Sequence, residues 1–169
     1  FLLSLSSVQT KFAQRITQSV NESFNTDISI EKASINLNGD VLVSNILIQD
    51  HHKDSLLFVK ELKTSLNGLE RFMNRDYNFN SIGLDGVRLF LTQYKGETKS
   101  SLQHFIAKLR DTTSTERVPF SFQSKILELK TSELVSEDMN ELNSKKSFSN
   151  IDLVLKDFNF DSNILSLAI

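Results

Sequence analysis

The chain has 169 residues, of which 39% are hydrophobic and 24% charged, so it can bury a core and is neither disordered nor a multi-span membrane protein. A formal net charge of −2 gives no field that would attract a polyanion, which argues against nucleic acid as a partner. The sequence contains no cysteine, which excludes disulfides and thiolate metal sites.

Both ends of the sequence are apolar. Phe1, Leu2, Leu3 and Leu5 are too few to span a bilayer, which takes about 20 apolar residues, but they fit the last turn of a spanning helix as well as they fit a buried helix. The apolar run 164–169 would leave unpaired strand groups at the end of a finished domain. We therefore expect the chain to be part of a longer polypeptide.

Between residues 8 and 24, apolar side chains recur every four positions, which predicts a helix with one apolar stripe. Ser6 or Ser7 can cap the start of this helix, and Asn25 can end it. The members of the stripe, separated by polar residues, are Val8, Phe12, Ile16, Val20 and Phe24.

After Asp27 the apolar period changes from four to two, which is typical of strands. Ile28 and Ile30 alternate with polar residues, but the next apolar pair is out of phase by one position, and a second slip occurs near Ser44-Asn45. Because one position reverses the face in a strand, each slip predicts a bulge or a break. The turn signal Asn38-Gly39 lies between the slips, so we expect a bent hairpin.

The rest of the pattern predicts more strands and two short helices. A third strand is expected from Leu56 to Leu66, a helix from Asn67 to Arg75, and a second hairpin across Asp85-Gly86. The range 101–110 matches a helical template, and a charged loop is expected at 137–146. Segments 35–43 and 82–91 share a pattern that suggests a repeat. The last expected strands, which bring the total to roughly eight or nine, fall in 120–129, 132–136, 151–160 and 163–169.

The residues offer little catalytic chemistry. The histidines are His51, His52 and His104, and the sequence contains no phosphate-binding loop, nucleophile elbow or zinc-protease motif. His51 and His52 point to opposite sides of an extended chain, so both can bind one ion only in an irregular loop. A solvated loop is favoured over a metal site, His104 is expected on the exposed side of its helix, and neither a cofactor nor enzymatic activity is expected.

Strands with one apolar side must cover that side with something. In a closed sandwich a second sheet covers it, whereas in an open, curved sheet acyl chains can do so, at about 0.8 kcal/mol for each buried methylene. Periodicity does not separate these two cases, and taken alone it favours an ordinary protein core.

Segments near the N-terminus resemble a known family. Residues 2–13 (LLSLSSVQTKFA) and 24–33 (FNTDISIEKA) resemble the start of TamB-like proteins of the AsmA-like superfamily, and 37–50 and 54–57 look like the next strands of that family. The resemblance is good over residues 2–66 and looser beyond them. Eukaryotic chorein-type bridge-like lipid transfer proteins are related to this family.

The resemblance implies a mainly β fold with a few short helices: a curved, elongated antiparallel sheet that forms an open apolar groove, with an N-terminal amphipathic helix at its mouth. It implies that residues 1–6 end a membrane anchor, 7–26 form the helix and 27–169 begin the β-groove repeats. The implied membrane-proximal residues are Phe1, Leu2, Leu3, Leu5, Val8 and Phe12. The implied groove-lining residues are Ile28, Ile30, Ile35, Leu37, Val41, Val43, Ile46, Ile48, Leu89 and Leu91.

The function implied by the resemblance is conduction of phospholipid between the inner and outer membranes of the bacterial envelope, in support of outer-membrane biogenesis. The implied partners are phospholipid, the inner membrane and a TamA- or BamA-like β-barrel assembly protein. The alternative is a scaffold for outer-membrane protein assembly or secretion, in which a sheet edge pairs with the barrel partner. An enzyme would need paired carboxylates in a polar cleft, and the sequence does not predict them.

Overall fold

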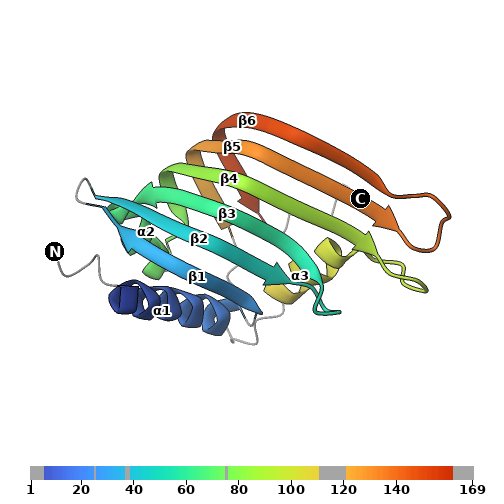
Figure 1. The fold of residues 1–169 in the computed structure, drawn as a ribbon, viewed down its shortest axis with the longest axis horizontal. Coiled ribbons are helices and arrows are strands. Elements are labelled where there is room, and N and C mark those ends of the chain that lie inside the picture. The colour runs from blue at the N-terminus through green and yellow to red at the C-terminus, as the bar shows by residue number, and fades with distance from the viewer. Residues whose placement is uncertain (1–5, 25, 37–38, 75, 111–120, 162–169) are drawn as a thin grey trace.

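A computed structural model describes residues 6–24, 26–36, 39–74, 76–110 and 121–161 of the chain. Six strands form one open, mixed sheet in the order of the sequence, and three helices accompany it. The sheet is strongly curved, and the helices lie on its concave side (Figure 1). The elements are α1 (Ser6–Phe24), β1 (Ile28–Ile35), β2 (Asp40–Gln49), β3 (Ser55–Ser65), α2 (Leu66–Met73), β4 (Asn78–Gln93), α3 (Ser101–Arg110), β5 (Ser121–Asp138) and β6 (Lys146–Asp161).

The three predicted helices are confirmed, with small changes at the ends of the first two. Among the described residues, no helix is both long enough and apolar enough to cross a bilayer. The expected anchor residues Phe1 to Leu5 and the apolar run 164–169 lie outside the described residues, as does the expected helix stop at Asn25.

Neighbouring strands are antiparallel except β4 and β5, which run parallel. The expectation of an antiparallel sheet is therefore wrong at this one junction. Parallel neighbours need a crossover connection, commonly a helix, and α3 lies in the connection between β4 and β5. The sequence pattern located this helix but gave no information on the direction of the strand that follows it.

The later strands are longer than expected. β4 continues through Asp85-Gly86, so the second predicted hairpin is wrong, and β5 continues through the break expected before Ser132. Six described strands therefore replace the larger predicted number within residues 28–161. Segments 35–43 and 82–91 are not equivalent repeats, because the first turns between two strands and the second is a single strand.

A line of backbone irregularities, which we call the crease, crosses the sheet. It consists of one residue with left-handed φ in each of four strands: Asn45 (φ 53°), Gly86 (φ 63°), Thr131 (φ 50°) and Asn150 (φ 55°). β6 has a second such residue, Asp157 (φ 51°), which lies outside the crease. Such a residue interrupts the alternation of a strand, so that Val43 and Ile46, three positions apart on β2, join the same hydrophobic cluster. The phase slip predicted near Ser44-Asn45 is confirmed as this feature.

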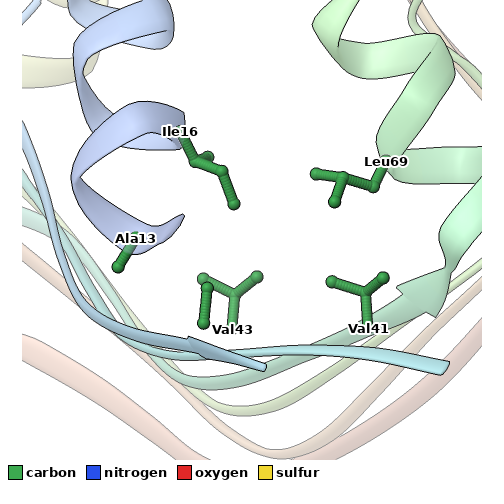
Figure 2. Packing of buried hydrophobic residues seen from close by; sticks show 6 residues of the cluster. Ala13, Ile16, Val41, Val43 and Leu69 are labelled. Atoms are coloured by element: carbon green, nitrogen blue, oxygen red, sulfur yellow. The ribbon is translucent and has the colours of Figure 1, made fainter. Parts of the chain in front are cut away.

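Helix α1 covers the concave face over the first two strands. Ala13 and Ile16 of α1 and Leu69 of α2 point toward Val41 and Val43 of β2, and all five side chains are buried (Figure 2). Full burial of such an aliphatic side chain contributes about 1.5–3 kcal/mol to stability. Ala13 lies outside the predicted apolar stripe, and its small side chain allows the helix backbone to approach the sheet.

Asn21 fixes the turn from α1 into β1. Its side-chain amide donates a hydrogen bond to the carbonyl oxygen of Ile28 (2.8 Å), and its Oδ1 accepts hydrogen bonds from the backbone N–H of Ile28 (2.8 Å) and the hydroxyl of Thr26 (3.2 Å). Thr26 is itself buried. These bonds determine how the helix returns over the sheet.

Candidate functional site

An unbroken aliphatic row crosses all six strands. Residues paired on neighbouring strands project to the same side of a sheet, so the strand register traces such rows. The first row consists of Ala33, Val43, Leu62, Leu84, Leu129 and Leu153. Because Ala33 and Val43 belong to the cluster under α1, this row lies on the concave face.

A second apolar row crosses the sheet on the other side of the crease. It consists of Ile28, Ile48, Leu57, Leu89, Leu134 and Phe148. Ile28 packs against the cluster under α1, so this row shares the concave face. The crease therefore allows both halves of the strands to turn apolar side chains to one side, which strict alternation along a straight strand would not allow.

The long strands carry a third apolar region at the end where β5 begins. Phe79, Ile82 and Leu127 are buried there, and Phe122 and Phe158 pack against them. The ring of Phe122 lies 5.4 Å from that of Phe79 and 6.0 Å from that of Phe158. Leu62 packs against this cluster and against the cluster under α1, so the two clusters share one face.

The predicted groove-lining residues gather on this face. The cluster under α1 contains or contacts Ile28, Ile30, Ile35, Val41, Val43 and Ile46. Ile48 and Leu89 belong to the second row, Leu91 follows Leu89 by two positions on β4, and Leu37 lies outside the described residues. Of the predicted membrane-proximal residues, Val8 and Phe12 lie on α1.

Sequence reasoning missed the members of the rows on the later strands. Leu62, Leu84 and Leu129 were not predicted as part of the face, nor were the terminal members of the rows, Leu153 and Phe148. These residues stand in apolar segments of the sequence. Their common face depends on the register of strands that are distant in sequence, and local periodicity does not contain that register.

Burial changes along the rows. In the first row, Ala33 is 0% and Val43 5% exposed, whereas Leu153 is 42% exposed; Phe148, which ends the second row, is 55% exposed. The main contacts of the helices with the sheet fall on β1 to β4. The concave face is therefore a protein core at the β1 end and a solvent-exposed apolar surface at the β6 end.

The convex face has a different chemistry. The row behind the first apolar row reads Ser34, Leu42, Lys63, Gly83, Glu128 and Val154. Lys63 pairs with Asp40 at 2.8 Å, and the hydrogen bond that its ammonium group donates to this carboxylate raises the pKa of Lys63. Arg88 lies 3.7 Å from Glu133 on the same face. The convex row thus mixes polar and charged side chains with Leu42 and Val154, whereas the two concave rows contain only apolar residues.

The structure also brings the three histidines together. His104, expected to be solvated, has a side chain that is 38% exposed and a ring stacked on that of His51, with 4.1 Å between the centroids. The turn that carries His51 and His52 is irregular, which is the one condition under which both can reach a common partner. Both side chains are exposed, as expected for a solvated turn, and both also contact Glu97.

Comparisons of the chain with protein-family models, with curated proteins and with solved structures find no match. The assignment of a function therefore depends on the geometry and chemistry of the concave face.

Proposed function

We propose that the chain is the opening part of a TamB-like, inner-membrane-anchored protein of the bacterial envelope that conducts phospholipid between the two membranes along the concave face. The observation that carries the proposal is the pair of apolar rows that continue across an open sheet beyond the cover of the helices. Leu153 and Phe148, at the ends of the rows, keep about half of their surface exposed to solvent (42% and 55%).

The rows favour acyl chains as the occupant because they contain only apolar residues. Each buried methylene contributes about 0.8 kcal/mol, so contact with about ten methylenes provides about 8 kcal/mol, before the cost of ordering the chain. That energy corresponds to a dissociation constant of about 1 μM. Since neither row includes a charged side chain, binding should depend on the acyl chains more than on the headgroup.

The proposal assigns a role to each end of the sheet. Residues 1–6 would end the anchor, and α1 would close the β1 end of an apolar groove through the contacts of Ala13 and Ile16 with β2. The exposed end at β6 would pass lipid to further strands of the same kind. The residues available to lipid are those at the uncovered end of the two rows, Leu129, Leu153, Leu134 and Phe148, whereas Val41 and Val43 belong to the core beneath α1.

Two adjacent residues of β6 provide a matched test. Leu153 (42% exposed) pairs with Leu129 on the concave face, and Val154 (56% exposed) pairs with Glu128 on the convex face. The full chain and its variants Leu153→Asp and Val154→Asp are incubated with vesicles of phosphatidylethanolamine and phosphatidylglycerol and recovered. Lipid phosphorus per protein is then measured, and circular dichroism checks the fold of each variant.

We expect Leu153→Asp to retain at most about one third of the lipid bound by the unmodified chain, because a carboxylate is strongly disfavoured against acyl chains. Val154→Asp should retain all of it. Equal lipid in both variants, or no lipid on the unmodified chain, would refute lipid binding at this face.

The terminal position of β6 in the described sheet favours a second candidate function, an assembly scaffold. A terminal strand can pair with a strand of another protein through backbone hydrogen bonds. This function predicts crosslinks from β6 to a TamA- or BamA-like barrel protein that persist in Leu153→Asp. Loss of the crosslinks together with the bound lipid would favour the conduit.

A further inference from the structure

A cluster of potential metal ligands lies outside the apolar face. His51 and His52 occupy the turn between β2 and β3, Glu97 lies between β4 and α3, and His104 belongs to α3. The cluster includes all the histidines of the chain, and with Glu97 its members come from three segments that the fold brings together.

The three histidines present the same ring nitrogen to one carboxylate. Nε2 of His52 lies 2.7 Å from Oε1 of Glu97, and Nε2 of His51 lies 2.9 Å from Oε2 of Glu97. Nε2 of His104 lies 3.5 Å from Oε2 of the same residue. The candidate ligand atoms of His51, His52 and Glu97 all lie within 4.8 Å of one another.

This spacing is close to that of a metal centre. A tetrahedral Zn²⁺ site has ligand bonds of about 2.0–2.1 Å, so its ligand atoms lie about 3.3 Å apart. Glu97 lies 2.7 Å from the ring of His52 and 2.9 Å from that of His51, and no pair of ligand atoms among these three residues is more than 4.8 Å apart. Small side-chain movements would therefore turn the lone pairs of the rings and the carboxylate toward a common ion.

The surroundings hold the ligands in place. The ring of Tyr94 lies against that of His52, with 3.9 Å between the centroids, and its hydroxyl donates hydrogen bonds to Oδ2 of Asp50 (2.6 Å) and Oδ2 of Asp54 (2.9 Å). Asp50 is buried, and its Oδ1 accepts a hydrogen bond from the backbone N–H of His52 (2.8 Å). Outer contacts that orient the ligands are a regular part of metal sites.

The loop that carries Glu97 is fixed in the same way. The side-chain amides of Gln93 (2.9 Å) and Asn140 (3.2 Å) donate hydrogen bonds to the carbonyl oxygen of Glu97. Lys53, which lies next to His52 in sequence, directs its ammonium group to Asp27 at 2.7 Å. Besides the ligand Glu97, the carboxylates of Asp50 and Asp54 lie near the histidines. This excess of negative charge favours the binding of a cation.

We propose that His51, His52 and Glu97 form a binding site for a divalent transition-metal ion, with Zn²⁺ as the best chemical match. Imidazole and carboxylate ligands suit Zn²⁺, whereas Mg²⁺ and Ca²⁺ prefer oxygen ligands alone. The bound ion would tie the turn between β2 and β3 to the segment between β4 and α3, at the start of the crossover that makes β4 and β5 parallel. The site is independent of lipid binding, and either proposal can fail alone.

Calorimetric titration of the full chain with Zn²⁺ alone tests the site. We expect one ion per chain with a dissociation constant of 10 μM or tighter, on the order expected for three protein ligands. Zn²⁺ at about a hundred-fold excess over that constant should raise the unfolding midpoint by about 5 °C or more, and EDTA should reverse the increase. Co²⁺ should give the visible absorption bands of a tetrahedral complex.

Single variants separate the site from nonspecific binding. Glu97→Gln preserves the shape of the side chain and should weaken Zn²⁺ binding at least about ten-fold, as should His52→Ala. The control is Glu70→Gln on the exposed surface of α2, which should leave binding unchanged. Absence of Zn²⁺ binding to the folded chain would refute the proposal, and so would unchanged affinity in Glu97→Gln.

Discussion

The two ends of the curved sheet share one apolar pattern but differ in what covers it. At the β1 end, Ala33 and Val43 are buried beneath α1; at the β6 end, Leu153 of the same row is 42% exposed. The difference shows that an apolar face of a sheet becomes a core only where another element covers it. The same pattern becomes a surface available to acyl chains where no helix packs closely.

The largest expected effect separates these two ends directly. Val43→Asp places a carboxylate beneath Ile16 in the cluster under α1, and we expect a loss of about 4 kcal/mol or more in the free energy of unfolding. Leu153→Asp, in the same row, should cost less than about 1 kcal/mol because the side chain reaches water. Urea unfolding at pH 7 measures both values, and similar losses would contradict the distinction between the two ends.

A smaller loss in the free energy of unfolding is expected from a substitution in the crease. The crease allows apolar side chains from both halves of the strands to point to the concave face. A Cβ at Gly86 would lie 2.8 Å from Cβ of Lys60, at φ 63°, so Gly86→Ala should cost about 2 kcal/mol. The matched control is Gly83→Ala on the same strand, where the nearest atom would be 3.8 Å away and little loss is expected. Equal unfolding free energies for the two variants would mean that the crease is not under steric constraint.

The smallest expected effect concerns an ion pair near the covered end. Asp27 lies 2.7 Å from Lys53 and 3.8 Å from Lys108, and the hydrogen bond with Lys53 lowers the pKa of Asp27 below its ordinary value of 3.8. A lowered carboxyl pKa stabilises the fold above that ordinary value, and the contribution is lost as the pH falls through the lower pKa of the folded state.

Because Asp27 is largely exposed, Asp27→Asn should cost no more than about 0.5 kcal/mol at pH 7 and nothing at about pH 2. Urea unfolding of the unmodified chain and of Asp27→Asn, at pH 7 and at about pH 2, measures the difference in their free energies of unfolding. A difference that stays constant between the two pH values would show that the effect does not come from ionisation of Asp27.

Local signals in the sequence predicted the helices and the first hairpin, because helical periodicity and the Asn38-Gly39 turn are short-range features. The similar dipeptide Asp85-Gly86 was misread. Gly86 has a left-handed φ and faces Lys60 of β3, but it lies inside β4 and makes no turn. β4 continues past it, paired with β3 on one side and with β5 on the other. Pairing on both sides of a strand is long-range information, and a two-residue pattern does not contain it.

The same limit applies to both candidate sites. The apolar face could be predicted where strands are close in sequence, as for Ile28 to Ile48, but Leu153 required the register of all six strands. The histidine cluster depends on the crossover that places His104 and Glu97 beside the turn after β2. No spacing of residues within the sequence indicates that these segments meet.

The most direct test of lipid on the concave face uses the absence of cysteine from the chain, which allows a single label at a chosen position. Cysteine is introduced at Leu153 or at Val154, a fluorophore is attached, and vesicles with brominated acyl chains are added. We expect quenching of the label at position 153, on the concave face, and little at position 154. Equal quenching at both positions, or no quenching at position 153, would contradict it.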